Sequence, residues 1–265
     1  MKSEPRNLWT KVPGEYTEMP TITAYFPEKK LSDAAVVIFP GGGYRIRAEH
    51  EGKGYAEFLA QNGYTAFVVE YRVWPQEFPL PLLDARRAVR WVRYHAKEYG
   101  IAKDKIAVMG SSAGAHLAAL VSTYYDRIEG EETDEIDREE FLPNAQILCY
   151  PVISMQDDGI SHAGSIENFL GNRKEALAAA VSPDLLVSEI TPKAFVWHTF
   201  SDPGVNVMNS LNYVKSLKTA GVEAELHIFP QGAHGLGLAD GEDKVSKHVA
   251  QWSGLLLKWL AFIGF

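Results

Sequence analysis

Short apolar runs alternate with longer amphipathic stretches along most of this chain. Residues 34–39 read AAVVIF, a β-branched apolar run that ends at Pro40 and three glycines, which predicts a central strand entering a loop. Helical stretches are predicted between these runs, and the first two end at Gly63 and Gly100. The predicted strands span residues 34–39, 65–71, 106–109, 146–152, 194–199 and 223–229, and the predicted helices span residues 51–62, 82–99, 113–124 and 207–220.

This order of elements predicts βαβ crossovers and an α/β fold with a doubly wound, mostly parallel sheet. Residues 21–26 are expected to add an edge strand. Residues 154–190 interrupt the rhythm with several glycines around one Ala-rich helix at about 174–181, and we expect a short cap-like insertion there. No internal repeat or linker is visible, so we expect one domain over residues 1–265.

Residues 129–140, EGEETDEIDREE, form a dense acidic run that we interpret as a solvated loop. The composition, 46% hydrophobic and 23% charged, is that of an ordinary globular chain. With 26 basic and 34 acidic residues the net charge is -8, which argues against nucleic acid or anionic lipid as a partner. Cys149 is the only cysteine, so an internal disulfide and a cysteine-based zinc site are excluded.

The first residues, 1–9, contain Lys2, Glu4, Pro5 and Arg6 with no apolar stretch behind them. This pattern lacks the apolar core of a secretory signal, and no later segment approaches the length of a membrane span. We therefore expect a cytoplasmic protein.

A candidate nucleophile lies in residues 110–114, which read GSSAG and match G-x-S-x-G with Ser112 at the centre. The string alone is weak in a chain with 22 glycines. Its context is more specific, because a predicted strand enters it and a small-residue helix leaves it, as a nucleophile elbow requires. Ser111 is interpreted as a polar residue of the tight turn.

A serine hydroxyl needs a base, and the base needs a carboxylate that holds it in the right tautomer. In this arrangement the partners follow in the order serine, acid, histidine, each on a loop after a strand. His234 follows the predicted strand 223–229 within QGAHG, and Asp202 follows the strand 194–199 within TFSDP. The sequence therefore predicts a triad of Ser112, Asp202 and His234.

The remaining histidines and nearby aspartates are assigned simpler roles. Packing within strands, on helices or in the insertion is expected for His95, His116, His162, His198, His227 and His248. Loop or cap positions are expected for Asp157, Asp158, Asp184 and Asp240.

Stabilisation of an oxyanion is predicted for the glycine run PGGGY that follows the first long strand. Backbone N–H groups of Gly42 or Gly43, together with that of Ala113, are the expected donors. A phosphate cradle is a poor alternative, because no Lys-Ser/Thr follows and no G-x-G-x-x-G is present. Neither a metal nor an organic cofactor is expected.

With these motifs the chain resembles the α/β-hydrolase superfamily. Within it, the chain resembles hormone-sensitive-lipase-like esterases, in the branch with bifunctional feruloyl and acetyl xylan esterases and related carbohydrate acetyl esterases. The resemblance begins at about Thr21 and rests on FPGGGY (39–44), HEG (50–52), YRV (71–73), PLLDARRA (81–88), GSSAGAHLA (110–118), SDP (201–203) and GAHGLGL (232–238). Phe39 and Pro40 replace a histidine common before the glycines, which leaves open what supports the oxyanion loop, and Ala115 replaces a common glycine.

Other residues of these motifs receive structural or substrate roles. Arg72 and Asp84 are expected to pair. Tyr44 and Trp74 are expected to contact substrate, since aromatic faces suit sugar rings, although a core role for Trp74 stays open. For His50 and Glu51 the sequence leaves open whether they line the mouth of the site or cap a helix.

The expected activity is that of a serine esterase that works through an acyl-enzyme. The resemblance implies short acyl groups, chiefly acetyl, on a sugar or xylo-oligosaccharide, so the expected partner is a small-molecule ester. A general short-chain carboxylesterase and an arylformamidase-like amide hydrolase are the alternatives among enzymes. Outside enzymes, a catalytically silent binding module is the alternative, and homo-oligomer formation stays open.

Overall fold

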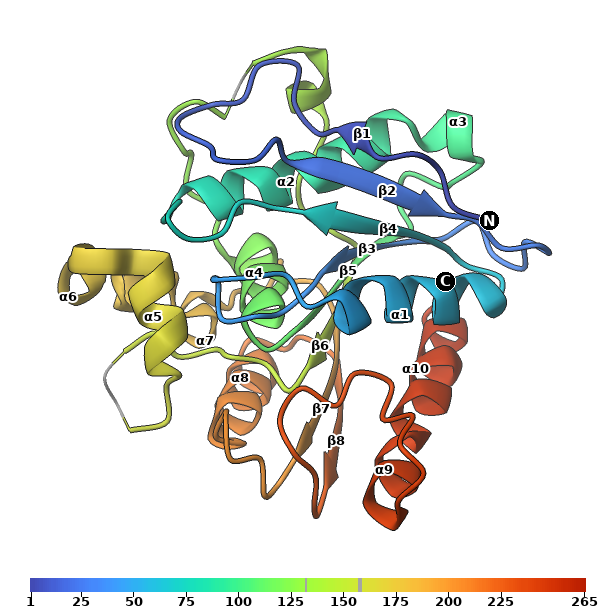
Figure 1. Cartoon of the computed structure of the whole chain (residues 1–265), viewed down its shortest axis with the longest axis vertical. Coiled ribbons are helices and arrows are strands. Elements are labelled where there is room, and N and C mark those ends of the chain that lie inside the picture. Colours follow the sequence, from blue (N-terminus) through green and yellow to red (C-terminus); the bar gives the residue numbers. More distant parts are fainter. Residues whose placement is uncertain (132, 157–158) are drawn as a thin grey trace.

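A single sheet organises the computed structural model, which describes residues 1–131, 133–156 and 159–265. In this part of the chain the strand order is β1-β2-β4-β3-β5-β6-β7-β8 (Figure 1). The edge strands β1 and β2 are antiparallel to their neighbours, and the remaining pairs are parallel. The strands are β1 (Arg6–Asn7), β2 (Thr21–Tyr25), β3 (Ala35–Phe39), β4 (Thr65–Glu70), β5 (Ile106–Ser111), β6 (Ala145–Cys149), β7 (Ala194–Thr199) and β8 (Ala224–Phe229).

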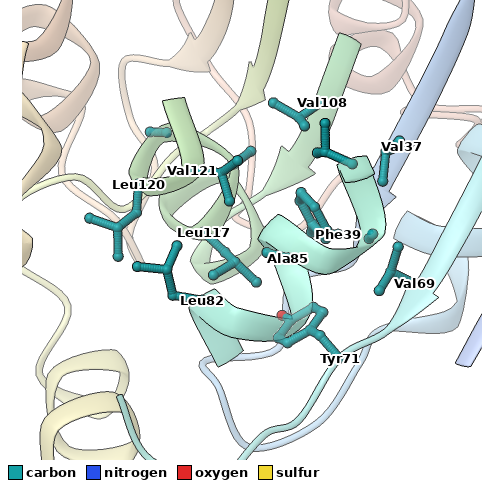
Figure 2. Packing of buried hydrophobic residues seen from close by; sticks show 14 of the residues in the cluster. Val37, Phe39, Val69, Tyr71, Leu82, Ala85, Val108, Leu117, Leu120 and Val121 are labelled. Atoms are coloured by element: carbon teal, nitrogen blue, oxygen red, sulfur yellow. The ribbon is translucent and has the colours of Figure 1, made fainter. Parts of the chain in front are cut away.

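Helices cover both faces of the sheet, as the predicted crossovers require. One face packs against α1 (Glu49–Gln61), α9 (Lys244–Val249) and α10 (Gln251–Phe262), and the other packs against α2 (Leu80–Tyr94), α4 (Ala113–Thr123) and α8 (Met208–Thr219). Figure 2 shows the second face, where Val37 and Phe39 meet side chains of α2 and α4. The alternate residues Val36 and Ile38 point to the first face, which explains why the whole of β3 is apolar.

The predicted strands are all present, with ends that differ by up to three residues, and the predicted edge strand is β2. The predicted helix 82–99 is wrong in one respect, because it is divided into α2 and α3 (Ala96–Tyr99). The break falls at His95, which has ψ 9° and stacks its ring on Trp91 at 4.1 Å between centroids.

The insertion after β6 contains more helical turns than the one predicted. Its elements are α5 (Ala163–Leu170), η2 (Gly171–Arg173), α6 (Lys174–Leu177), η3 (Ala179–Val181) and α7 (Pro183–Leu186). Figure 1 shows them as a group of short yellow helices to one side of α4. Asp157 and Asp158, the two aspartates assigned to a loop here, lie outside the described residues.

The acidic run 129–140 is not the solvated loop that the sequence suggested. Glu131 and Asp137 are buried, with 5% and 6% exposure, and both pair with arginines of α2. Part of the run forms the 3-10 helix η1 (Glu135–Arg138). Glu132, which belongs to the same run, lies outside the described residues. The prediction fails because opposite charges far away in the sequence cover this segment.

Two further properties concern the chain as a whole. None of the helices that the structure describes is long and apolar enough to cross a membrane. Cys149 is a free thiol in β6, and burial raises its pKa to about 12, so it stays protonated and packs as a small apolar group.

Candidate active site

Ser112 lies at the sharp turn between β5 and α4, as the elbow motif predicts. Its backbone has a positive φ of 52° with ψ -119°, a strained conformation for a residue other than glycine. The flanking glycines allow close packing: a methyl group on Gly110 would lie 2.2 Å from the Gly114 carbonyl oxygen, and one on Gly114 would lie 2.0 Å from that of Phe39. Any larger residue at either position would push the strand and the helix apart.

A continuous hydrogen-bond chain joins the three residues of the predicted triad. His234 Nε2 lies 2.8 Å from Ser112 Oγ, and His234 Nδ1 lies 2.8 Å from Asp202 Oδ2. Asp202 follows β7 and His234 follows β8, so the carboxyl ends of neighbouring parallel strands bring them together. The imidazole can therefore accept the serine proton at Nε2 while the carboxylate fixes Nδ1 as the protonated nitrogen.

Asp202 is held as an anion by several donors. Burial alone would raise its pKa, but hydrogen bonds from His198, His234 and the Val205 N–H outweigh burial and leave the pKa far below its usual range. The Gly204 and Val205 N–H groups donate to Oδ1 at 2.8 and 3.0 Å. The acid is thus ionised at any pH at which the protein is expected to work.

Two buried histidines near the triad are fixed by hydrogen bonds, and one of them also contacts Asp202. His198 contacts Ser210 Oγ at 2.8 Å and the Val205 carbonyl at 3.0 Å, and its Nε2 lies 3.3 Å from Asp202 Oδ2. His116 donates from Nε2 to the Val181 carbonyl, so its Nδ1 accepts from the Tyr44 hydroxyl at 2.6 Å. Burial lowers the pKa of His116 to about 4, and the ring is therefore neutral.

The glycine loop after β3 is fixed through its carbonyl groups. Each carbonyl from Pro40 to Tyr44 accepts a hydrogen bond, from the Tyr71 hydroxyl, Ala48 N–H, Arg45 N–H, Asn168 Nδ2 and Trp74 N–H in that order. Gly42 has φ 129°, and a methyl group there would lie 2.4 Å from the Ile46 carbonyl oxygen. The carbonyls are thus turned away from the site, which suits Gly42 or Gly43 to donate N–H groups inward.

Ala113 is the first residue of α4, so its N–H has no carbonyl four residues earlier within the helix. It therefore stays available beside Ser112, at the positive end of the helix dipole. The Ala113 N–H and the N–H groups of the glycine loop can therefore donate to a developing oxyanion from two sides.

Three residues contact the oxyanion loop although the sequence did not predict these contacts. Glu51 accepts the Gly41 N–H at 2.8 Å, and so holds the loop that the missing histidine left without support. Asn168 of α5 donates to the Gly43 carbonyl at 2.9 Å. His162 lies beside the same loop, since a methyl group on Gly43 would be 3.8 Å from its Cε1. For Glu51 the HEG motif was a signal in the sequence. The contacts of Asn168 and His162 had no such signal, because they depend on how the insertion packs against the glycine loop.

The imidazole of His162 has a defined tautomer. Its Nδ1 caps α5 by accepting the Ser165 N–H at 3.1 Å, so a neutral ring carries its proton on Nε2. Burial and the neighbouring His234 lower the pKa of His162, which favours that neutral form. The insertion thus brings a neutral N–H donor close to the oxyanion loop.

The expected substrate contact by Tyr44 needs correction. Its side chain is fully buried, its hydroxyl bonds His116, and its ring stacks on Phe169 at 4.4 Å. It supports the loop from behind and has no surface to offer a ligand. Trp74, by contrast, is 49% exposed and lines a cleft of about 300 Å³. The guanidinium carbon of Arg45 lies 5.4 Å from the centroid of the Trp74 ring.

Arg72 and Asp84 form the expected pair. The guanidinium contacts both carboxylate oxygens at 2.8 Å, and both side chains are almost fully buried. The Trp9 indole N–H also donates to Asp84 Oδ1, at 2.7 Å. The pair fastens the end of β4 to α2 and does not reach the triad residues.

Within the described residues, no group of three or more histidine, cysteine, aspartate or glutamate side chains is arranged to hold a metal ion. The groups at the site are those of acyl transfer: a hydroxyl, an imidazole, a carboxylate and backbone N–H donors.

A parallel sheet with a serine at a strand-to-helix turn, and an acid and a histidine on later strand ends, defines the α/β-hydrolase fold. The chain matches the BD-FAE family over residues 22–217 and belongs to that family of α/β-hydrolase esterases.

Solved structures of similar proteins cover almost the whole chain. An acetyl ester-xyloside bifunctional hydrolase from Caldicellulosiruptor lactoaceticus is 40% identical with a TM-score of 0.90, over 99% of this chain and 97% of that one. The carboxylesterase Cest-2923 from Lactobacillus plantarum is 27% identical with a TM-score of 0.81, over 98% and 97%.

Among curated relatives, an acetylxylan esterase of Xylanibacter ruminicola is 32% identical over 87% of this chain. The endo-1,4-beta-xylanase B of Butyrivibrio fibrisolvens is 31% identical over 94%. The matched regions make up 47% and 39% of those two proteins, so the chain spans less than half the length of these relatives.

Proposed function

We propose that this protein is a serine esterase that removes short acyl groups, chiefly acetyl, from a carbohydrate such as an acetylated xylo-oligosaccharide. The observation that carries the proposal is the hydrogen-bond chain from Ser112 through His234 to Asp202, with 2.8 Å at both links. The proposed substrate is supported by the relatives named for acetylxylan and acetyl ester-xyloside hydrolysis.

The geometry supports a two-step reaction. Ser112 Oγ attacks the ester carbonyl carbon while His234 Nε2 takes the serine proton, and the carbonyl electrons move onto oxygen. N–H groups of Gly42 or Gly43 and of Ala113 stabilise that oxyanion. Collapse of the intermediate expels the alcohol, which receives the proton from His234.

Deacylation reverses these roles. Water attacks the acyl-enzyme while His234 takes its proton, and the second intermediate releases the acid and returns the proton to Ser112. Asp202 stays ionised throughout and stabilises the imidazolium that forms twice per turnover. In this mechanism His234 carries every proton.

The test is acetate release from acetylated xylo-oligosaccharides, run beside hydrolysis of 4-nitrophenyl acetate and 4-nitrophenyl butyrate. Ser112→Ala is the blank and should be inactive on all three. Ser122→Ala is the matched control, because Ser122 lies on the same helix, is buried, and its hydroxyl donates to the Ala118 carbonyl at 2.8 Å. It should keep the wild-type rates.

The outcomes separate the proposal from its alternatives. A kcat/KM on the sugar that equals or exceeds that on the aryl ester supports a carbohydrate acetyl esterase. Activity on aryl esters alone points to a general short-chain carboxylesterase, and activity on N-formyl aryl amines points to an arylformamidase-like enzyme. A chain that a serine-directed phosphonate does not label would be a silent binding module.

Cytoplasmic location and organisation as one domain stay predictions from the sequence, and the sequence leaves homo-oligomer formation open.

A further inference from the structure

Glu51 is a buried carboxylate in the first turn of α1, and each of its oxygens is bonded to a different part of the site. Oε2 accepts the Gly41 N–H at 2.8 Å, and Oε1 accepts the Tyr150 hydroxyl at 2.7 Å. The Tyr150 oxygen in turn accepts the Gly237 N–H at 2.9 Å. Gly237 lies three residues after His234, so one carboxylate joins the glycine loop to the histidine loop.

The charge of Glu51 is not matched by a close cation. It is 3% exposed, and its one ion-pair contact among the described residues is with His50, whose Nε2 is 3.9 Å away. That imidazole is 59% exposed and donates from the same Nε2 to the Gly235 carbonyl at 2.9 Å. Burial of a carboxylate supported by neutral donors is costly, which calls for a reason beyond packing.

Tyr150 provides an independent observation. It directly follows β6 and has φ 37°, a left-handed conformation that is uncommon for an aromatic residue. Its hydroxyl also lies 3.1 Å from that of Tyr55, which contacts Ser111 Oγ at 2.8 Å. Its ring packs edge-on against His234, with 5.2 Å between centroids. Backbone strain of this kind gathers at functional sites.

We infer that Glu51, acting through Tyr150, is a positioning residue that holds the oxyanion loop and the His234 loop in register across Ser112. The inference rests on the triad and oxyanion loop proposed above. Gly41 N–H is used to anchor the loop, and this leaves the next N–H groups, of Gly42 and Gly43, to face the reacting oxygen. Without the anchor the loop can shift along the site, and the donors lose their alignment.

The position of Glu51 also admits a simpler role, because an acidic side chain in the first turn of a helix stabilises that helix. A helix-stabilising role predicts lower thermal stability with unchanged turnover per active site. A positioning role predicts lower kcat at similar KM, since the affected interaction is made in the transition state. Thermal stability and kcat per active site, measured on the same variants, therefore distinguish the two roles.

The experiment measures kcat and KM on 4-nitrophenyl acetate for Glu51→Gln, Glu51→Ala, Tyr150→Phe and the double variant Glu51→Gln/Tyr150→Phe. Active sites are counted by stoichiometric phosphonate labelling of Ser112. Loss of one oxyanion donor lowers kcat about 10²–10³-fold, so loosening of the loop should cost about 100-fold in Glu51→Ala. Glu51→Gln keeps an acceptor for Gly41 and should lose only about tenfold.

The double variant tests whether the two residues act through one contact. Glu51→Gln and Tyr150→Phe both alter the 2.7 Å bond, so the double variant should lose less than the product of the single losses. Losses that multiply, or a wild-type kcat per active site in both single variants, would overturn the inference. Should Glu51→Ala fail to fold, the nearly isosteric Glu51→Gln and Tyr150→Phe still decide the question.

Glu131→Gln is the matched control. It makes the same change at another buried glutamate, which is 5% exposed and pairs with Arg86 far from the triad. It should lower thermal stability and leave kcat unchanged. Activity retained by Ser112→Ala would overturn the triad and this inference with it, whereas failure of sugar deacetylation alone would reject the substrate and leave the result on the aryl ester valid.

Discussion

Carboxylates are buried in two regions of this molecule, and the groups that accompany them differ. At the active site, in the part of the chain that the structure describes, Glu51 accepts hydrogen bonds from neutral donors, the Gly41 N–H and the Tyr150 hydroxyl. Asp202 accepts from histidines and backbone N–H groups. On the outer side of α2, Glu131 and Asp137 meet arginines. The first arrangement holds backbone loops and the imidazole in place, while the second neutralises charge locally.

The arginine cluster, Arg86, Arg87, Arg90 and Arg93 of α2, fastens Glu131 and the segment 133–142 to the helix. Arg87 forms two bonds with Asp134, at 2.6 and 2.7 Å, and approaches Asp137 at 2.8 Å. Arg87 lowers the pKa of Asp134 more than burial raises it. Among described side chains, Arg86 Nε has no hydrogen-bond partner, so the cluster is incompletely satisfied.

The comparison separates two uses of buried charge. Where opposite charges meet, removal of one partner leaves the other uncompensated and the cost falls on stability. Where a carboxylate meets neutral donors around reacting groups, we expect its removal to lower the rate per active site. Substitutions in the two regions should therefore move different measurements.

The largest effect is expected from Asp202→Asn. The amide can no longer hold His234 with its proton on Nδ1, and kcat on 4-nitrophenyl acetate should fall roughly 10³–10⁴-fold, by analogy with serine proteases. The far-UV circular dichroism should stay that of a folded protein. Asp134→Asn, the same change in the arginine cluster, should leave kcat unchanged. Undiminished turnover by Asp202→Asn would remove it from the triad.

A large effect of the opposite kind is expected from Arg87→Ala. This change leaves Asp137 buried without its arginine and should lower the free energy of unfolding by about 3–5 kcal/mol, measured by urea denaturation. Turnover per phosphonate-labelled site should match the wild type. Lys247→Ala, which breaks an exposed pair with Glu242, should leave stability unchanged. Reduced turnover per site in Arg87→Ala would contradict the separation of the two regions.

A change of pH should have an intermediate effect on the free energy of unfolding, because the neutral imidazole of His116 is buried behind the active site. Burial lowers the pKa of His116 from its usual 6.5 to about 4. The unfolded chain binds this proton first as pH falls, so stability is complete above pH 6.5 and is lost on acidification toward pH 4. The free energy of unfolding that is lost through His116 should reach about 3 kcal/mol.

The measurement is urea denaturation at several pH values between 7 and 4 for the wild type and for His116→Gln. Glutamine can replace both hydrogen bonds but does not titrate, so the variant should lose less stability on acidification. Equal slopes for the two proteins would show that His116 is already protonated or exposed.

The sequence predicts most of what depends on neighbours along the chain. The apolar run of β3 and the glycines on either side of Ser112 act within a few residues, and chain order alone points to Asp202 and His234. These signals reflect strand burial, backbone sterics and the common edge at which parallel strands end. These local signals were sufficient to predict the fold class and the three residues of the triad.

The sequence does not predict features that depend on distant partners. The acidic run looked solvated because its arginines are on α2, although their spacing at 86, 87, 90 and 93 was itself a signal of one charged helix face. Tyr44 looked like a substrate contact because the loop position was visible but the covering Phe169 of the insertion was not. Glu51 stayed undecided because its partner Tyr150 is 99 residues away.

The smallest effect is expected at Trp74, which lies outside both charged regions and remains a proposed substrate contact. Its exposed ring lines the cleft beside Arg45, so Trp74→Ala should raise KM for acetylated xylo-oligosaccharides about fivefold, or about 1 kcal/mol of aromatic contact. The KM for 4-nitrophenyl acetate should not change, because that ester has no sugar to contact the ring. Phe262→Ala, at an exposed aromatic on α10, is the control and should change neither constant. An unchanged KM for the sugar in Trp74→Ala would place the sugar elsewhere, so that neither aromatic residue predicted from the sequence would contact it.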